Sequence, residues 1–347
     1  MERGKILKLA NEYIKLEDNA DFADQVVKLV AEENFTELED RFYRNLDFGT
    51  GGIRGVIGGG YNRMNPFMIR KVSQGLATYI NKAAAGKEAS IVIAHDSRRC
   101  SRLFAETASA VFCANGIKTY LFTSLRPTPE LSFAVRQLGC ISGVVVTASH
   151  NPAEYNGYKV YGSDGCQITS DAAKEIQDTI NSTDVFNGVK QGNFDEGMKN
   201  GSIKYIPESI ITSFVETIKK LTMLQPGEKI DKNVAIVYSP LNGTGLKPVT
   251  RVLKETGFTN VTVVKEQENP DGHFPTCPFP NPEIKEAMQL GMEYAKRLNA
   301  DMLLATDPDC DRVGIAVKDE KGEYRLMTGN EVGALFTEYV LSQYKAQ

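Results

Sequence analysis

The sequence of 347 residues contains no apolar run long enough to cross a lipid bilayer. A membrane-spanning helix needs about 20 consecutive apolar residues, whereas the longest runs here, such as 144–146 and 302–305, have the length of a strand. The N-terminal residues M-E-R-G-K-I-L-K also lack the apolar segment of a secretory signal peptide. These absences predict a cytoplasmic protein without a membrane partner.

Cysteine pairs and an excess of positive charge are missing as well. The chain has no C-x-x-C pair, which argues against a disulfide framework or a thiolate zinc site and favours a reducing compartment. Lys and Arg number 40 against 44 Asp and Glu, so the net charge is −4. No general basic field is present to attract nucleic acid, although a local pocket can still hold an anion.

Two nucleotide-binding loops are also absent. No G-x-x-x-x-G-K-[ST] occurs, and the glycine-rich segment G-T-G-G-I-R-G at 49–55 has Arg54 where the last glycine of a dinucleotide loop belongs. We therefore expect a flexible loop that presents Arg54, whose guanidinium suits bidentate capture of a phosphate. An ordinary surface turn is the alternative.

The hydrophobic pattern predicts an α/β protein. Residues 1–46 and 66–84 have helical patterns, and the later sequence alternates between strands and helices, which implies parallel sheets covered by helices. The strands are expected at 91–94, 118–122, 141–147, 234–238, 261–264 and 301–306, and the helices between them at 101–114, 128–138, 245–256 and 283–298. The polar, turn-rich stretch 184–202 is expected to carry the boundary between two such units, and a strand at 324–327 with a helix at 330–344 is expected to open a third.

The segment T-A-S-H-N-P at 147–152 places Ser149 directly after a predicted strand. Binding groups collect at the C-terminal ends of parallel strands, so Ser149 is a candidate site residue. The serine of an ordinary helix N-cap is the alternative. A hydrolase nucleophile elbow needs G-x-S-x-G, and Thr147 and Asn151 occupy the two glycine places, which argues against that chemistry.

The segment A-T-D-P-D-C-D-R at 305–312 places three aspartates, Asp307, Asp309 and Asp311, on one loop after another predicted strand. Carboxylates this close together repel one another unless a cation binds, and hard oxygen ligands suit Mg²⁺. A calcium-binding EF-hand is excluded, because Arg312 and Lys318 occupy the places of its glycine and its last glutamate. A solvated acidic turn is the remaining alternative.

The segment N-G-Y-K at 156–159 begins seven residues after Ser149. Lys159 can neutralise a phosphate or carry a proton, whereas a solvated surface lysine is the alternative. Together, the serine, the aspartates and the cations form a consistent set for phosphoryl transfer.

In these segments the sequence resembles the α-D-phosphohexomutases, the phosphoglucomutase/phosphomannomutase superfamily. T-A-S-H-N-P resembles the phosphoserine loop of that family, D-P-D-C-D-R its metal loop and N-G-Y-K its lysine segment. F-G-T-G-G-I-R-G followed by N-R-M-N, within 48–65, resembles the type-2 phosphoglucomutase and phosphopentomutase branch, which also carries an N-terminal helical extension. The resemblance extends in order over residues 40–330.

The resemblance implies an α/β fold of repeated three-layer domains with mixed, mostly parallel sheets. It places a helical extension at 1–46, the phosphoserine domain at 47–203, the metal-loop domain at 204–321 and the start of a third domain at 322–347. Family members have four domains around a central cleft. Their sugar-recognition loop and last phosphate-binding loop would lie beyond Gln347, so we expect this chain alone to be weak or inactive as a mutase.

The resemblance also implies roles for the candidate residues. Ser149 would be the phosphorylated residue, and a phosphoserine oxygen would bind Mg²⁺ together with the three aspartates. Lys159 or His150 would carry the proton. The transferring phosphate would be surrounded by Arg54, His150, Asn151, Lys159 and Arg312.

The implied function is that of a phosphosugar mutase. It would move a phosphoryl group between positions 1 and 6 (or 5) of an aldose phosphate such as that of glucose or mannose, through a sugar 1,6-bisphosphate that also serves as activator. A Mg²⁺-dependent phosphatase or kinase is the alternative, but it would need an aspartyl nucleophile or a nucleotide loop, and a non-catalytic anion-binding module is the third possibility. The preferred sugar and the oligomeric state stay open.

Overall fold

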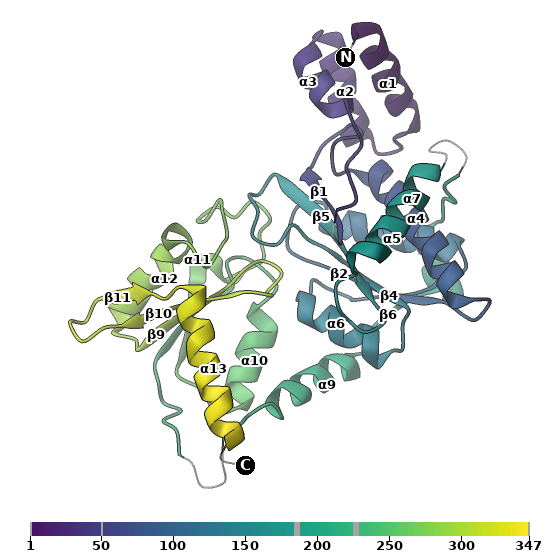
Figure 1. Ribbon diagram of the computed structural model, residues 1–347. Coiled ribbons are helices and arrows are strands. Elements are labelled where there is room, and N and C mark those ends of the chain that lie inside the picture. The colour runs from purple at the N-terminus through teal and green to yellow at the C-terminus, as the bar shows by residue number, and fades with distance from the viewer. Residues whose placement is uncertain (1, 50, 184–187, 225–228, 346–347) are drawn as a thin grey trace. The chain divides into compact units, whose positions relative to one another are not determined.

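The computed structural model describes residues 2–49, 51–183, 188–224 and 229–345, and these fall into two units (Figure 1). The first unit comprises Met1–Leu125, Leu131–Ala148 and Glu154–Ile206. The second comprises Pro207–Gln347 together with two short segments, Arg126–Glu130 and Ser149–Ala153. The second unit is therefore discontinuous in sequence.

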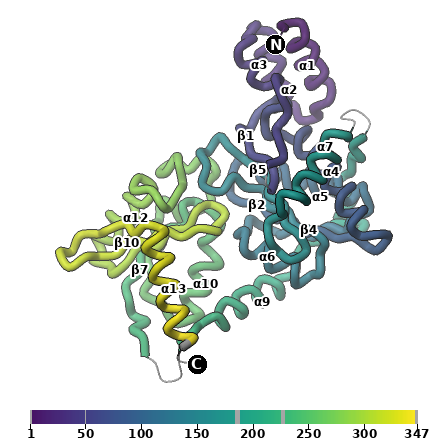
Figure 2. Tube along the Cα trace, viewed as in Figure 1, coloured from purple at the N-terminus to yellow at the C-terminus, as the bar shows by residue number. Residues whose placement is uncertain are grey.

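The first unit begins with three helices, which lie next to one another in Figure 2: α1 (Arg3–Leu16), α2 (Ala20–Ala31) and α3 (Phe35–Phe42). Asn19 and Asn34 cap α2 and α3 by accepting hydrogen bonds from backbone amides. Tyr13 is fully buried, and its ring contacts Phe42 and Phe67 edge-on at centroid distances of 5.9 and 5.7 Å. These contacts pack the helices against α4 (Pro66–Ala84), and the helical pattern predicted for residues 1–46 is confirmed.

A six-stranded mixed sheet forms the centre of the first unit, in the order β1-β5-β4-β2-β3-β6. Strands β2, β3, β4 and β6 are parallel, whereas β5 is antiparallel to β4 and β1 is antiparallel to β5. The strands are β1 (Gly52–Val56), β2 (Ser90–His95), β3 (Lys118–Leu121), β4 (Ser142–Val146), β5 (Tyr155–Gly162) and β6 (Ile203–Tyr205).

Helices cover both faces of this sheet (Figure 1), because alternate residues of β4 contact different helices. Val144 and Val146 belong to a core shared with helices α4, α5 and α7. Gly143 faces α6, where an added Cβ would come within 2.5 Å of Val135. The helices after α4 are α5 (Ser101–Ala114), α6 (Thr128–Gln137), α7 (Ser170–Ser182) and α8 (Phe194–Asn200).

The second unit contains a five-stranded mixed sheet in the order β11-β10-β9-β7-β8. Strands β7, β8 and β9 are parallel, and β10 and β11 continue the sheet in antiparallel pairs. The strands are β7 (Ile236–Ser239), β8 (Val261–Val263), β9 (Met302–Thr306), β10 (Val313–Lys318) and β11 (Tyr324–Leu326). The helices are α9 (Glu208–Lys219), α10 (Leu246–Glu255), α11 (Lys265–Glu268), α12 (Lys285–Leu298) and α13 (Gly329–Lys345).

The predicted fold class is confirmed, but one local expectation is wrong. The glycine-rich loop expected at 49–55 contains strand β1, because its backbone pairs with β5 from Gly52↔Lys159 to Val56↔Tyr155. The turn-rich stretch 184–202, of which 184–187 lie outside the described residues, also contains helix α8, and its role as a boundary stays a prediction. The strand and helix predicted at 324–327 and 330–344 are present as β11 and α13, and β11 pairs with β10 at the edge of the second sheet. The expected domain boundaries themselves stay predictions.

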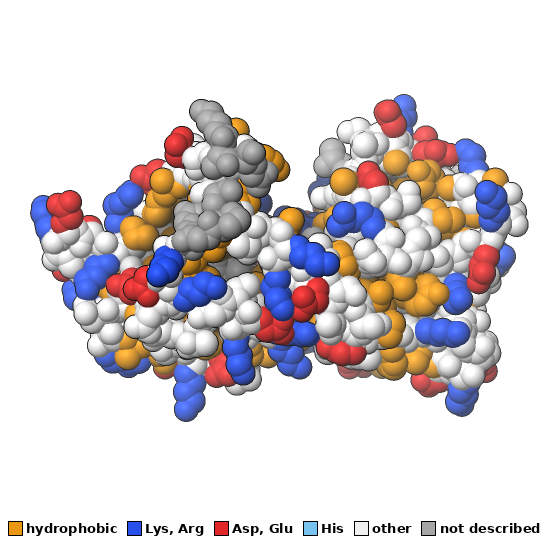
Figure 3. Space-filling model, turned by 90° about the horizontal axis from the view of Figure 1, so that it is seen from below, with side chains coloured by type: hydrophobic (Ala, Val, Ile, Leu, Met, Phe, Trp, Pro, Cys, Tyr) orange, Lys and Arg blue, Asp and Glu red, His pale blue; other side chains and the backbone are white. Residues whose placement is uncertain are grey.

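The surface agrees with the small net charge. On the face seen in Figure 3, positive and negative side chains are intermixed, with hydrophobic side chains between them. Within the described ranges, no helix has both the length and the apolar content of a membrane span.

Candidate active site

The loop over residues 307–312 connects β9 to its antiparallel neighbour β10, at the C-terminal ends of the parallel strands. Asp307 organises this loop. Its Oδ1 accepts hydrogen bonds from the amides of Asp311 and Arg312, both at 3.1 Å, and its carbonyl accepts one from the amide of Cys310 at 2.9 Å. Cys310 has a φ of +54°, so the turn contains a left-handed residue that is not glycine.

Three carboxylates converge on this loop. One oxygen each of Asp307, Asp309 and Asp311 lies within 4.8 Å of the other two, and Asp307 and Asp309 are fully buried while Asp311 is exposed. Burial, together with the charges of Asp309 and Asp311, holds the pKa of Asp307 well above its ordinary value. Closely spaced carboxylate oxygens are the ligands that Mg²⁺ prefers, so this donor set fits a divalent cation.

Ser149 contacts the same loop. Its Oγ donates a hydrogen bond to Asp307 Oδ2 at 2.9 Å and lies 3.3 Å from His150 Nδ1. Ser149 is only 3% exposed, and its φ of +53° is unfavourable for a residue with a side chain. Such strained residues are concentrated at functional sites. The ring of His150 lies edge-on to Phe279, with 6.1 Å between the ring centres.

The connection after β7 supports the backbone of the aspartate loop, residues 307–312. Thr244 donates two hydrogen bonds to the carbonyl of Pro308, one from its amide and one from its hydroxyl, both at 2.9 Å. A Cβ added at Gly243 would come within 2.4 Å of Pro308 Cα, so only glycine allows this approach. Thr128 supports the loop from another segment, through hydrogen bonds to Asp309.

In the first unit, Asp96 anchors Thr147, which begins the segment that leads to Ser149. It is 1% exposed and accepts hydrogen bonds from Thr147 Oγ1 at 2.6 Å, Ser101 Oγ at 2.7 Å and the amide of Arg98 at 2.9 Å. Burial raises the pKa of Asp96, and the Arg98 charge with these hydrogen bonds opposes that rise. Asp96 therefore holds Thr147, two residues before Ser149, from within the core.

Arg54 and Lys159 lie on the paired strands β1 and β5 of the first unit. Arg54 is opposite Gly157, and Lys159 is opposite Gly52. Residues two apart on a strand share a face with their cross-strand partners, so both cations lie on one face of the sheet as diagonal neighbours. A glycine stands opposite each of them.

The structure therefore groups the predicted residues in two sets. Ser149, His150 and the three aspartates lie together in the second unit, with Asn151 in the segment that follows His150. Arg54 and Lys159 lie together in the first unit. Arg312 is half-exposed in the second unit and forms an ion pair with Glu283 at 3.1 Å. The phosphate-binding roles of these residues stay predictions.

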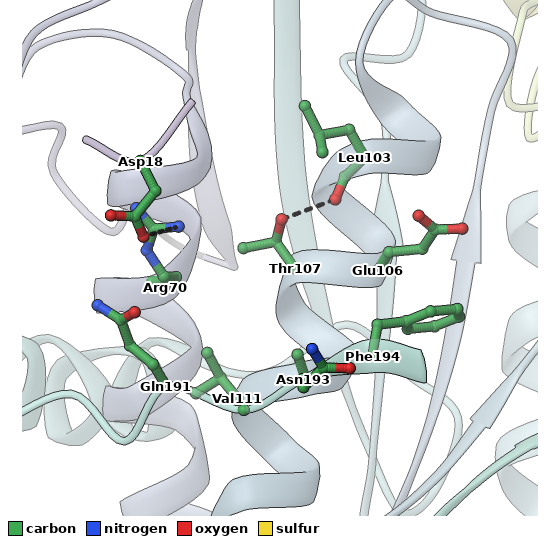
Figure 4. Close-up of a pocket in the computed structure, with 11 residues that line it drawn as sticks. Asp18, Arg70, Leu103, Glu106, Thr107, Val111, Gln191, Asn193 and Phe194 are labelled. Atoms are coloured by element: carbon green, nitrogen blue, oxygen red, sulfur yellow. Dashed lines mark hydrogen bonds and ion pairs between the residues drawn. The ribbon is translucent and has the colours of Figure 1, made fainter. Parts of the chain in front are cut away.

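A separate cavity of about 290 Å³ in the first unit contains none of the predicted site residues among those that line it. Figure 4 shows Asp18 and Arg70, joined by an ion pair at 3.4 Å, on one side and Thr107 of α5 on the other. Its lining contains two carboxylates, of Asp18 and Glu106, and the cation Arg70, whereas three carboxylates form the cluster on the loop over residues 307–312.

Sequence reasoning missed three supporting residues: Asp96, Thr128 and Thr244. Asp96 follows the strand predicted at 91–94, and a polar residue at the C-terminal end of a parallel strand is the signal that could have identified it. Thr128 stands between Pro127 and Pro129, and the two flanking prolines are the signal that could have identified it. Thr244 and Gly243 have no comparable sequence signal, because their importance comes from the close approach of Pro308.

Comparison with known families agrees with this geometry. The alpha/beta/alpha domain I of phosphoglucomutase/phosphomannomutase matches residues 45–186, and domain II matches residues 212–322. The chain belongs to the phosphoglucomutase/phosphomannomutase family, within the α-D-phosphohexomutase superfamily.

Individual relatives support the same assignment. The chain is 38% identical to a phosphoglucomutase of Staphylococcus saprophyticus, over 87% of this chain and 54% of that protein. It is 35% identical to a phosphoribomutase of Saccharomyces cerevisiae, over 96% of this chain and 56% of that protein. A crystal structure of a phosphoglucomutase/phosphomannomutase family protein from Burkholderia thailandensis matches with a TM-score of 0.67 and 25% identity, over 86% of this chain and 59% of the other. The chain thus spans a little over half the length of these relatives.

Proposed function

We propose that this chain carries the phosphoserine and metal-binding parts of a sugar-phosphate mutase. The observation that supports this most directly is the hydrogen bond from Ser149 Oγ to Asp307 Oδ2 at 2.9 Å, inside a cluster of three carboxylates. An acidic cluster around a serine is poor chemistry for a simple nucleophile, because the carboxylates repel an anion. It becomes useful when a cation joins the aspartates and a phosphoryl group sits on the serine.

In the proposed reaction, phospho-Ser149 transfers its phosphoryl group to a hydroxyl of an aldose monophosphate. The Ser149 Oγ–P bond breaks and a bond from phosphorus to the sugar oxygen forms. The proton of the sugar hydroxyl passes to Ser149 Oγ, carried by His150 or Lys159. The sugar bisphosphate then reverses its orientation in the site. It returns to Ser149 the phosphoryl group at its other position, so that a 1-phosphate becomes a 6- or 5-phosphate.

Charge neutralisation is the main task of the site. A phosphoserine carries a charge of about −1.5 to −2, and it would adjoin Asp307, Asp309 and Asp311. When bound to those aspartates, Mg²⁺ supplies the positive charge that the phosphate oxygens require. Arg54, Lys159 and Arg312 are the proposed cationic partners of the phosphate, with Asn151 as a hydrogen-bonding partner. Relatives named phosphoglucomutase and phosphoribomutase make a hexose or pentose phosphate the proposed substrate.

Peptide mapping by mass spectrometry tests the proposal. The purified chain is analysed before and after incubation with glucose 1,6-bisphosphate and Mg²⁺, and we expect phosphate on the peptide that contains Ser149. Ser149→Ala should abolish this signal, whereas Ser163→Ala, at an exposed serine after β5, should leave it unchanged.

Two results would contradict the proposal. One is phosphate at the same level on the Ser149→Ala chain. The other is an unphosphorylated Ser149 both in this chain and in one extended to the length of its relatives. A coupled assay in which the 347-residue chain turns over normally would contradict only the expectation that this chain alone is weak or inactive.

A further inference from the structure

We propose that Thr128 is a positioning residue that restricts Asp309 to a single oxygen for the bound cation and thereby favours Mg²⁺ over Ca²⁺. This inference rests on the proposed function, because it assumes that the three aspartates hold a divalent cation. It concerns a residue outside the aspartate loop and far from it in sequence.

Thr128 makes two hydrogen bonds to Asp309. Its hydroxyl donates to Asp309 Oδ2 at 2.9 Å, and its amide donates to the Asp309 carbonyl at 2.9 Å. Thr128 is 5% exposed and Asp309 is fully buried, so water does not compete effectively for these bonds. One residue thus fixes both the backbone and the carboxylate of a proposed metal ligand.

The sequence around Thr128 holds it in place. Thr128 is the first residue of helix α6, and the rings of Pro127 and Pro129 fix the backbone φ angle on either side of it. Arg126 and Glu130 are both buried and form an ion pair at 3.6 Å, which ties the two ends of the segment together. Little conformational entropy is therefore lost when the hydroxyl engages Asp309.

Occupation of one carboxylate oxygen has a consequence for the choice of metal. Mg²⁺ demands near-octahedral geometry and takes single oxygens, whereas Ca²⁺ accepts about six to eight ligands and often takes both oxygens of a carboxylate. The hydrogen bond from the Thr128 hydroxyl takes one acceptor position of Oδ2 and fixes the orientation of the carboxylate, which disfavours binding of a cation by both oxygens of Asp309. Loss of that hydroxyl allows Asp309 to present both oxygens, which suits the larger ion.

Thr244 provides a matched control. It is also a buried threonine, 3% exposed, and it also makes two hydrogen bonds of 2.9 Å to the same loop. Both of its bonds go to the Pro308 carbonyl and neither goes to a carboxylate. Thr244→Val therefore removes a hydroxyl that supports the loop without changing the oxygens available on Asp309.

The experiment measures the affinities of the unphosphorylated chain for Mg²⁺ and Ca²⁺ by displacement of Mn²⁺, followed by electron paramagnetic resonance. We compare the wild type with Thr128→Val, Thr128→Ser and Thr244→Val, after circular dichroism has shown that each is folded. We expect Thr128→Val to lower the ratio of Mg²⁺ to Ca²⁺ affinity about tenfold, in line with other residues that orient metal ligands. Thr128→Ser keeps the hydroxyl and should retain the wild-type ratio, as should Thr244→Val.

The outcomes separate this inference from the proposed function. A wild type that binds neither ion overturns the proposed metal site and the inference with it. A wild type that binds Mg²⁺, with an unchanged ratio in Thr128→Val, overturns only the role of Thr128. The same follows if Thr244→Val shifts the ratio as far, because the effect then reflects general loosening of the loop. If Thr128→Val does not fold, Thr128→Ala takes its place, since it also removes the hydroxyl.

Discussion

The connection from β4 to β5 and the connection from β9 to β10 occupy the same place in two sheets of the same plan. The strand orders β1-β5-β4-β2-β3 and β11-β10-β9-β7-β8 match position by position, and the parallel and antiparallel pairs match as well. In each sheet, the loop that carries the candidate site residues follows the last parallel strand, β4 or β9, and leads into its antiparallel neighbour, β5 or β10. One of these loops contains Ser149, and the other contains the three aspartates.

The two loops differ in how they are supported. In the first unit the connection after β2 supplies a buried carboxylate, Asp96, which accepts hydrogen bonds from Thr147 and two further residues. In the second unit the equivalent connection after β7 supplies Gly243 and Thr244, which are neutral. A fourth carboxylate beside a loop that already carries three would add electrostatic repulsion. The support of this loop therefore comes from a hydroxyl and from close packing. The charge of a loop thus restricts the chemistry of its scaffold.

The largest expected effect is a loss of Mg²⁺ affinity, and it distinguishes the role of the aspartates from that of the serine. Asp307→Asn should reduce Mg²⁺ affinity on the order of 100-fold, because it removes a charged ligand, and it should abolish phosphorylation of Ser149. Ser149→Ala should abolish phosphorylation but leave Mg²⁺ affinity nearly unchanged. Isothermal titration calorimetry and peptide mass spectrometry measure the two quantities. Equal loss of Mg²⁺ affinity in both variants would show that the two loops do not have separate roles.

Removal of the buried carboxylate in the first unit should have the next largest effect. Asp96→Ala leaves the hydroxyls of Thr147 and Ser101 without their acceptor and removes the carboxylate that pairs with buried Arg98 at 3.4 Å. We expect a loss of about 3–5 kcal/mol in the free energy of unfolding, measured by urea denaturation. Asp96→Asn, which keeps an acceptor, should lose less. A loss below about 1 kcal/mol, the contribution of one ordinary hydrogen bond, would exclude an anchoring role for Asp96.

Glu130 is a buried carboxylate that contrasts with Asp96, because neither of its oxygens accepts a hydrogen bond among the described residues. Burial raises the pKa of Glu130 from 4.5 to about 7, and Arg126 opposes this rise. Between pH 4.5 and about 7, the folded chain therefore keeps a proton on Glu130 that the unfolded chain releases. The resulting stability is complete below pH 4.5 and is lost as the pH rises to about 7.

Glu130→Gln should remove this pH dependence. At one pKa unit per 1.36 kcal/mol, the loss between those pH values amounts to about 3 kcal/mol in the wild type. Urea denaturation at a series of pH values measures it, with the exposed Glu320→Gln as the control. The assignment fails if Glu130→Gln and the wild type have the same pH profile.

The smallest effects are expected for Gly157 and Gly243, which pack against the backbones of the two loops. A Cβ at Gly157 would come within 2.5 Å of the Thr147 carbonyl, and one at Gly243 within 2.4 Å of Pro308 Cα. Either alanine should cost about 1–3 kcal/mol of unfolding free energy through overpacking. Gly243→Ala should also weaken Mg²⁺ binding, whereas Gly157→Ala should not. Thermal denaturation and calorimetry give both values, and weaker Mg²⁺ binding in Gly157→Ala would contradict the proposed separation.

The sequence was most informative where local signals are strong. Helix α4 has the bounds predicted for it, because Asn65 caps it and Pro66 occupies its first turn. Strand β1 was not predicted, because its glycine-rich segment has a low strand propensity and is fixed by pairing with β5.

The site itself depends on contacts between residues far apart in sequence. Ser149 and Asp307 are separated by 158 positions, and Thr128 and Asp309 by 181. No local pattern indicates either contact. The serine and the aspartates were identified because each lies in a recognisable motif, whereas Thr128 lies in none that was recognised.

The discontinuous second unit has a consequence for how such a sequence can change. A cut between Ile206 and Pro207 leaves the aspartates on one piece, and Ser149 and Thr128, whose hydroxyls bond to them, on the other. Exchange of gene segments at that point between diverged relatives would therefore join halves of a hydrogen-bonded site that had not changed together. Inheritance of the two halves as a pair is thus a condition for keeping the site intact.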